Sequence, residues 1–152
     1  MKVTARDAIA VATGALALLL AGAAVALGSQ PIPGAKYKGR TDEKTPASFR
    51  VANSAKNIPT YDFHFSYRCS NGTHGPTAFG SNKQTKPIPV AKNGTFALHE
   101  TVTAASQRTK FAISGAFTDK GKQASGHFTE HLRGNNGVTC KSGKVTFKVH
   151  RV

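Results

Sequence analysis

The chain contains no tryptophan, one methionine, two cysteines and only seven acidic residues, against 21 lysines and arginines, in 152 residues. It also lacks a nucleophile elbow, a phosphate-binding P-loop and a dinucleotide-binding fingerprint. Neither cysteine has a C-x-x-C partner or a nearby histidine, which argues against a zinc site. We therefore expect a protein that is not an enzyme and that uses no cofactor and no metal.

The excess of positive charge belongs almost entirely to the chain after residue 27. The formal net charge is +14, and the only charged groups before that point are Lys2, Arg6 and Asp7. A surface of this sign attracts phosphate-rich polymers and acidic lipids. The candidate anion-binding residues form a loose group of lysines: Lys110, Lys120, Lys122, Lys141, Lys144 and Lys148. A polyanion bound there would be displaced by salt.

The N-terminal segment is directed to a membrane. Residues 8–27 are apolar except for Thr13, follow a short basic start, and end in the A-x-A-like sequence Ala24-Val25-Ala26. About 20 apolar residues also suffice to span a bilayer as a helix. We expect a signal peptide cleaved near Ala26, with a retained signal anchor as the alternative. Residues 28–36 are then a linker to a domain over 37–152, which is secreted or anchored on the outside.

The two cysteines, Cys69 and Cys140, support an extracellular location. Disulfides persist in oxidising compartments, and an exported chain with an even number of cysteines commonly pairs them. Only one pairing is possible, and the chain-entropy model values such a long closed loop at roughly 4 kcal/mol. Two buried free thiols are the alternative.

The stretch YDFHFSYRC, Tyr61 to Cys69, alternates large apolar residues with polar ones. In a β-strand this pattern gives one core face and one solvent face. Similar alternation occurs in KYKGRT, ASFRVAN, KPIPVAK, TFALHETV, KFAISGAFT, GHFTEHLR and KVTFKVHRV, with turn signals such as KNGT, DKGK and RGNNG between strands. The sequence predicts an all-β domain, an antiparallel meander of about eight strands that closes as a barrel or a sandwich.

Two acidic residues fall on the apolar face of their strands. Glu100 and Glu130 have the same parity as the hydrophobic residues around them. An unpaired buried carboxylate is costly, so we expect a partner, and Arg151 shares the inner parity of the last strand. These three interior polar residues form either a salt bridge at an open end of the barrel or the polar floor of a ligand cavity.

The stretch HFTEH, His127 to His131, has the H-x-x-E-H spacing of one class of zinc proteases. That chemistry requires a helix, whereas in a strand the two histidines lie roughly 13 Å apart, too far to share one zinc ion. The aromatic face of Tyr61 to Tyr67 is similar to the stacking platforms of single-strand binders. Core packing explains it more simply, and we expect no specific nucleic-acid partner.

The order of several segments resembles the small secreted β-domain proteins common in actinobacteria, over residues 37–151. The marks of the resemblance are Cys69-x-x-Gly72, the Pro-Ile-Pro before Asn93-Gly94-Thr95-Phe96, Ile113-Ser-Gly-x-Phe117, Ala124-Ser-Gly and Cys140-x-Ser-Gly143. The resemblance implies an exported, disulfide-bonded β-barrel or sandwich. It implies no catalytic residue and no known ligand.

Three functions remain open. We expect a non-enzymatic surface protein whose outward lysines engage an anionic cell-envelope polymer or a membrane surface. One alternative is a lipocalin-like carrier with a small ligand above Glu100, Glu130 and Arg151. The other is a structural envelope module with no ligand. Binding weakened by salt favours the first, and an interior cavity of sufficient size favours the second.

The export and disulfide predictions are tested together by mass spectrometry of protein purified from the export pathway of a bacterial host. We expect a chain that starts near Leu27 and is two hydrogens lighter than its reduced form, because cleavage and pairing both occur during export. A full-length mass would instead favour the anchor, and a mass without the missing hydrogens would contradict the disulfide.

Overall fold

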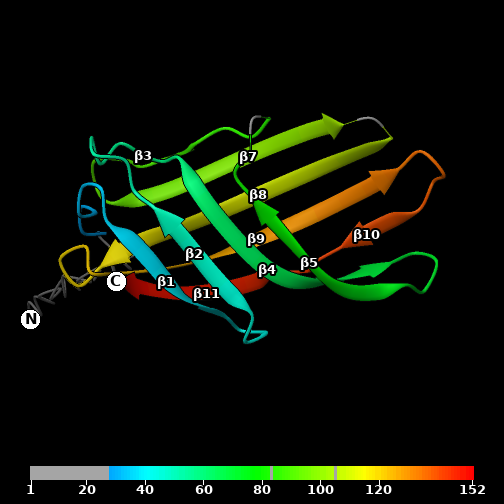
Figure 1. Ribbon diagram of the computed structural model, residues 1–152, viewed down its shortest axis with the longest axis horizontal. Coiled ribbons are helices and arrows are strands. Elements are labelled where there is room, and N and C mark those ends of the chain that lie inside the picture. The colour runs from blue at the N-terminus through cyan, green and yellow to red at the C-terminus, as the bar shows by residue number, and fades with distance from the viewer. Residues whose placement is uncertain (1–27, 83, 105) are drawn as a thin grey trace, which may run out of the picture.

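The computed structural model describes residues 28–82, 84–104 and 106–152, so the expected signal peptide or anchor lies outside the described residues. These described ranges form β-strands joined by turns and contain no helix (Figure 1). A bilayer-spanning helix is accordingly absent from this part of the chain. The prediction of an all-β domain is confirmed.

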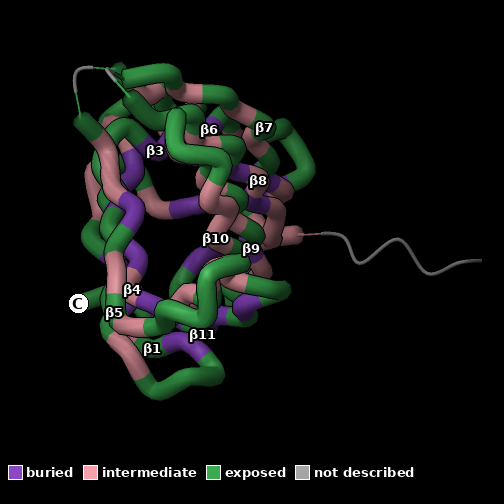
Figure 2. Tube along the Cα trace, turned by 90° about the vertical axis from the view of Figure 1, so that its right-hand side faces the viewer, coloured by how far each residue is buried: buried purple, intermediate pink, exposed green. Residues whose placement is uncertain are grey.

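The strands in chain order are β1 (Lys36–Thr41), β2 (Pro46–Arg50), β3 (Asn57–Ile58), β4 (Thr60–Cys69), β5 (His74–Gly80), β6 (Ile88–Pro89), β7 (Thr95–Ala104), β8 (Gln107–Thr118), β9 (Gln123–Gly134), β10 (Thr139–Lys141) and β11 (Val145–Arg151). Six of them pair in the closed order β4-β2-β1-β11-β9-β10, in which β10 pairs with both β9 and β4. The predicted meander therefore closes as a barrel, and Figure 2 shows the chain curling around a central space.

The remaining strands extend this ring. β8 and β7 continue outward from β9, β5 pairs with the other side of β4, and β3 pairs with β6 in a separate two-stranded sheet. All of these pairings are antiparallel, as expected for strands joined by short turns. Among the described strands, β5 and β7 have one strand partner each in the main sheet, so they are its two edges.

Two segments differ from the sequence-based expectation. The stretch HGPTAFG forms β5, although its glycines and proline are typical of turns. It pairs only with β4, and an edge strand tolerates the proline that a central strand rejects. The stretch KPIPVAK, expected to be a full strand, contributes only the two residues of β6. The number of long strands stays near the predicted eight, because β5 is gained and the strand expected in KPIPVAK is lost.

The segment before β1, expected to be a linker, packs against the barrel. Ser29 N–H donates to the carbonyl of Phe117 at 2.7 Å, and Pro31 is buried. The hydroxyl of Tyr37 donates to the carbonyl of Gly121 and accepts from Ile32 N–H. These bonds tie residues 28–35 to the turn between β8 and β9.

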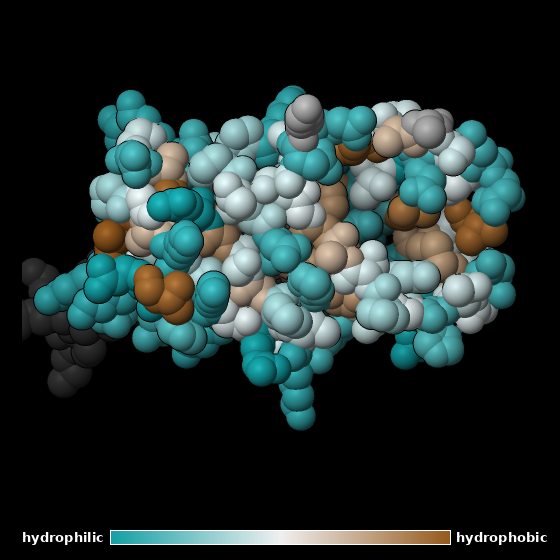
Figure 3. Space-filling view, in the orientation of Figure 1, coloured by the Kyte–Doolittle hydropathy of each residue, from teal (hydrophilic) through white to brown (hydrophobic). Residues whose placement is uncertain are grey.

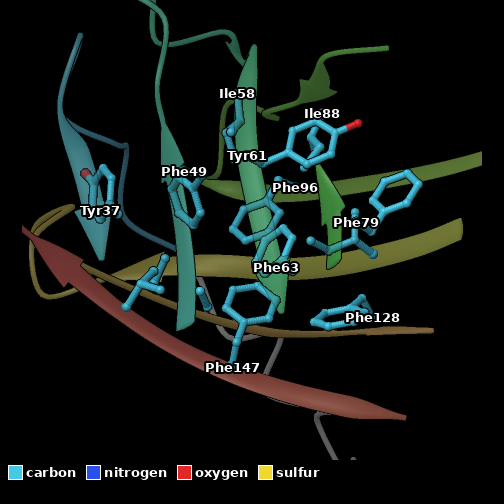
Figure 4. Packing of buried hydrophobic residues seen from close by; sticks show 14 of the residues in the cluster. Tyr37, Phe49, Ile58, Tyr61, Phe63, Phe79, Ile88, Phe96, Phe128 and Phe147 are labelled. Carbon is cyan, nitrogen blue, oxygen red and sulfur yellow. The ribbon is translucent and has the colours of Figure 1, made fainter. Parts of the chain in front are cut away.

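Aromatic side chains fill most of the barrel interior. Along β4, Tyr61, Phe63 and Phe65 are each at most 2% exposed, which confirms the alternation predicted for this strand. Phe63 packs against Phe128 and Phe147 with ring centroids 5.2 and 5.1 Å apart, and Figure 4 shows these rings converging from different strands. Aliphatic and aromatic burial of this extent is the main source of stability in a barrel of this size.

Glycines on the inner face make room for these rings. Gly115 and Gly126 lie directly opposite each other on β8 and β9. A Cβ atom at Gly115 would lie 2.5 Å from a ring carbon of Phe96, and one at Gly126 would lie 2.9 Å from a ring carbon of Phe147 and 2.2 Å from the carbonyl oxygen of Ser114. The close approach of rings and backbone therefore requires glycine at both positions.

Replacing Gly126 with alanine should lower the free energy of unfolding by about 1–3 kcal/mol, because the backbone of β8 must shift to admit the added methyl group. Gly75→Ala is the matched control, since the nearest described atom to a Cβ there would be the hydroxyl oxygen of Tyr67, at 3.8 Å, which is an ordinary contact distance. Urea unfolding of both variants measures the difference. Equal unfolding free energies for the two variants would show that the backbones of β8 and β9 leave room for a methyl group at position 126.

Candidate functional site

The strand β10 carries the predicted disulfide. Cys140 pairs in register with Cys69 on β4 and with Leu132 on β9, and the two cysteines are bonded to each other. The predicted Cys69–Cys140 bond is therefore confirmed. It lies on the inner face of the barrel wall, at the end where the β4–β5 and β9–β10 turns are found (Figure 1).

A cavity of about 230 Å³ opens beside this disulfide. Its lining combines apolar, sulfur and polar groups from β4, β5, β8, β9 and the segment around β10: Phe65, Tyr67, Cys69, Thr77, Gln107, Glu130, Leu132, Cys140, Lys141 and Ser142. Hydrophobic atoms reach the surface at the right-hand end of Figure 3, where these turns lie in Figure 1. The aromatic core ends at Phe65, so this end of the barrel is the part that its side chains leave unfilled.

Glu130 lies at the inner side of this cavity. On β9, Glu130 lies opposite the buried Phe111 of β8. It is the next inward-facing position after Leu132, toward the aromatic core. Its Oε2 atom is buried and has no hydrogen-bond partner among the residues that the structure describes, and its backbone N–H donates to Ser142 Oγ at 2.8 Å. Burial disfavours the carboxylate and raises the pKa of Glu130 from 4.5 to about 7. The predicted inward placement of this acid is therefore found.

The other two expected interior residues lie elsewhere. Glu100 occupies the position opposite Phe111 on β7, but both of its carboxylate oxygens accept the backbone N–H of Lys86, at 2.9 and 3.2 Å. It anchors the loop between the edge strands β5 and β7. Arg151 is exposed at the far end of β11, six residues beyond Val145, which is roughly 20 Å along the strand. The expected pairing of Arg151 with the interior acids is therefore corrected: the three residues form no common site.

On the outer face, strand register brings basic residues from five strands into one line. Lys110 lies opposite His131, His131 opposite Lys141, Lys141 opposite Arg68, and Arg68 opposite His74. All five side chains are exposed. At a strand spacing of about 4.8 Å, this outer basic row is roughly 19 Å long, and it follows the barrel wall from β8 across β10 to β5.

Further cations flank the outer basic row. Arg108 and Arg133 face each other in the next outward position of β8 and β9. Across the described residues, the one ion pair within 4.0 Å joins His64 and Asp62, so no member of the row is neutralised by a carboxylate at that distance. Like charges set directly opposite each other destabilise a sheet. The opposed pairs Lys141–Arg68 and Arg108–Arg133 therefore cost folding free energy unless an anion lies over them.

The six candidate lysines do not form one site. Lys110 and Lys141 belong to the outer basic row, and Lys120 and Lys122 lie at the β8–β9 turn at the other end of the barrel. Lys148 lies opposite Arg40 on a second basic face, beside the pair Lys38 and His150, while Lys144 is exposed in the turn before β11.

Of the five residues in the outer basic row, sequence reasoning proposed only Lys110 and Lys141 as anion-binding. Parity along each strand places Arg68 outward, but only cross-strand register sets it beside Lys141. His74 belongs to β5, the strand whose glycines and proline suggested a turn. The stretch around His127 and His131 forms the strand β9, as expected, and both side chains point to the outer face.

Comparison of the chain with protein-family models, with curated proteins and with solved structures finds no match. The functional assignment therefore depends on the geometry of these two features, the cavity and the outer basic row.

Replacing Glu130 with glutamine should remove a pH-dependent loss of stability. The pKa of Glu130 is about 7 in the folded protein and 4.5 in the unfolded chain, so the unfolded chain releases the proton at a lower pH. The parent protein therefore loses stability as the pH rises from 4.5 to about 7. Above about pH 7 the variant should exceed the parent in unfolding free energy by about 2 kcal/mol, with little difference near about pH 4. Urea unfolding across this range measures the change.

Glu100→Gln is the control for this measurement, because the carboxylate of Glu100 already accepts two hydrogen bonds and should show no such gain. A difference between the Glu130 variant and the parent that stays constant with pH would contradict the buried, unpartnered state of this carboxyl group.

Proposed function

We propose that this chain is an exported, non-enzymatic β-barrel that binds an anionic cell-envelope polymer along the outer basic row. The observation that carries the proposal is the register of Lys110, His131, Lys141, Arg68 and His74 on five neighbouring strands. The directly opposed cations Lys141 and Arg68 lower stability, and a phosphate-rich chain lying over them would reverse that cost.

The shape of the row favours a polymer over a flat membrane. The row follows the ring of strands around the barrel wall, because β10 joins β9 to β4 between its two halves. A flexible polyanion can follow such a curved line and contact every cation in it. A planar lipid surface touches only part of a curved line, so we expect vesicles to bind more weakly than a polymer of equal charge density.

The export route and the disulfide are consistent with this role. A signal sequence would deliver the domain outside the cell, where the Cys69–Cys140 bond persists. The bond holds Arg68 and Lys141 at the centre of the row, since each is the immediate neighbour of one cysteine. The binding surface is then fixed before the polymer arrives, which limits the conformational entropy lost on binding.

Lys110→Glu/Lys141→Glu should weaken binding of long-chain polyphosphate by tenfold or more at about 50 mM salt, and should reduce the dependence of log affinity on log salt by about two units. The reason is the loss of two counterion-releasing contacts from the row. Fluorescence anisotropy of labelled polyphosphate, measured over a series of salt concentrations, gives both quantities.

The matched control is Lys120→Glu/Lys122→Glu, which changes the net charge equally. Lys120 lies ten residues from Lys110, beyond the opposite end of β8. We expect its affinity to fall by less than about threefold, since only the long-range field changes. An equal loss in both variants would assign binding to net charge or to the second basic face, and no loss in either would contradict the proposal.

A further inference from the structure

The cavity beside the disulfide is a second feature, on the opposite face of the same strands from the outer basic row. It has a volume of about 230 Å³, larger than the roughly 150 Å³ of an engineered apolar cavity that takes up benzene. Its walls include Phe65, Leu132 and the sulfur atoms of Cys69 and Cys140. Such walls favour an apolar occupant of about the size of a substituted benzene.

One polar group distinguishes this cavity from a plain packing defect. Ser142 Oγ is already engaged, because it accepts the N–H of Glu130 and donates to the carbonyl of Gly143 at 2.6 Å. By contrast, the Oε2 atom of Glu130 is buried and finds no hydrogen-bond partner within the described ranges 28–82, 84–104 and 106–152. Glu130 as a whole is half-buried, but a buried carboxyl oxygen without a partner is itself uncommon in folded proteins.

The charges around the cavity select an uncharged occupant. The protein carries a net charge of +14 and Lys141 lines the cavity, so an organic cation is repelled. An organic anion would have to give up its hydration against the mainly apolar walls, and it would also meet a second negative charge whenever Glu130 is ionised.

We propose that this cavity binds one small, uncharged, apolar molecule that carries a hydrogen-bond acceptor, such as a carbonyl oxygen, and that the protonated carboxyl group of Glu130 donates to that acceptor. The hydrogen bond to the occupant does not depend on polyanion binding, because Glu130 is not a member of the outer basic row, although Lys141 lines the cavity and also belongs to that row.

The protonation state makes this binding dependent on pH. The pKa of Glu130, raised to about 7 by burial, leaves the carboxyl group protonated and able to donate below that pH. Above it the donor is lost and a negative charge faces the apolar walls, so affinity should fall by up to about tenfold per pH unit. The other titratable groups near the carboxyl group are Lys141 and Tyr67 on the cavity wall and Glu100 across Phe111.

The test uses two probes of nearly identical shape, acetophenone and α-methylstyrene, which differ in having a carbonyl oxygen or a methylene group. Calorimetric titration at about pH 5.5 and about pH 8.5 should show acetophenone binding at least tenfold more tightly at the lower pH. At about pH 5.5, α-methylstyrene should bind more weakly than acetophenone. The affinity for α-methylstyrene should change little between about pH 5.5 and about pH 8.5. Shifts of the Leu132 methyl signals in NMR spectra should place both probes in the cavity.

Two variants assign the effect to Glu130. Glu130→Gln keeps a donor at every pH, so acetophenone should bind it with similar affinity at both values, while Glu100→Gln should behave as the parent does. A pH effect that persists in Glu130→Gln would overturn the assignment to Glu130. Equal affinities for the two probes, or no shift at Leu132, would overturn the proposal as a whole.

Discussion

The pairing of β10 with both β4 and β9 is the constraint on which the rest of the structure depends. The three residues of β10, Thr139–Lys141, close the ring of six strands. The Cys69–Cys140 bond joins β10 covalently to β4 on one side of this closure. Without β10, the strands β4 and β9 would be connected only through β2, β1 and β11. The barrel would then be an open, curved sheet at this end.

The same short strand organises both proposed sites. Cys140 points inward and forms part of the cavity wall, whereas its neighbour Lys141 continues the outer basic row between His131 and Arg68. Because successive side chains of a strand point to opposite faces, one backbone segment serves an apolar interior and a cationic exterior. The aromatic core occupies much of the remaining interior, and the cavity lies beyond its end, near β10.

Sequence patterns predicted most of the fold because half-buried strands carry a strict period of two. The alternation in Tyr61 to Cys69 was sufficient to identify β4 and its inner face, and the two cysteines allowed only one intramolecular bond. The inward position of Glu130 followed from the same parity. The strand β5 was missed because Gly75 and Pro76 lower β-propensity, which matters less at a sheet edge.

Cross-strand relations were beyond the reach of the sequence, because parity gives a face but not a neighbour. Glu100 and Arg151 were assigned to one interior site on parity alone, yet Glu100 binds the backbone of Lys86 and Arg151 is exposed at the other end of the barrel. The outer basic row depends on four separate strand pairings, and each of them can be shifted without altering any single strand's pattern.

Closure of the ring by β10 is tested most directly by nuclear Overhauser contacts in the oxidised protein. Antiparallel register on both sides predicts backbone contacts from Cys140 to Cys69 and also from Cys140 to Leu132. Observation of both sets would establish the closed barrel, with the cavity on its inner side and the basic row on its outer side. Contacts to only one of the two strands would show an open sheet and would contradict the placement of both sites.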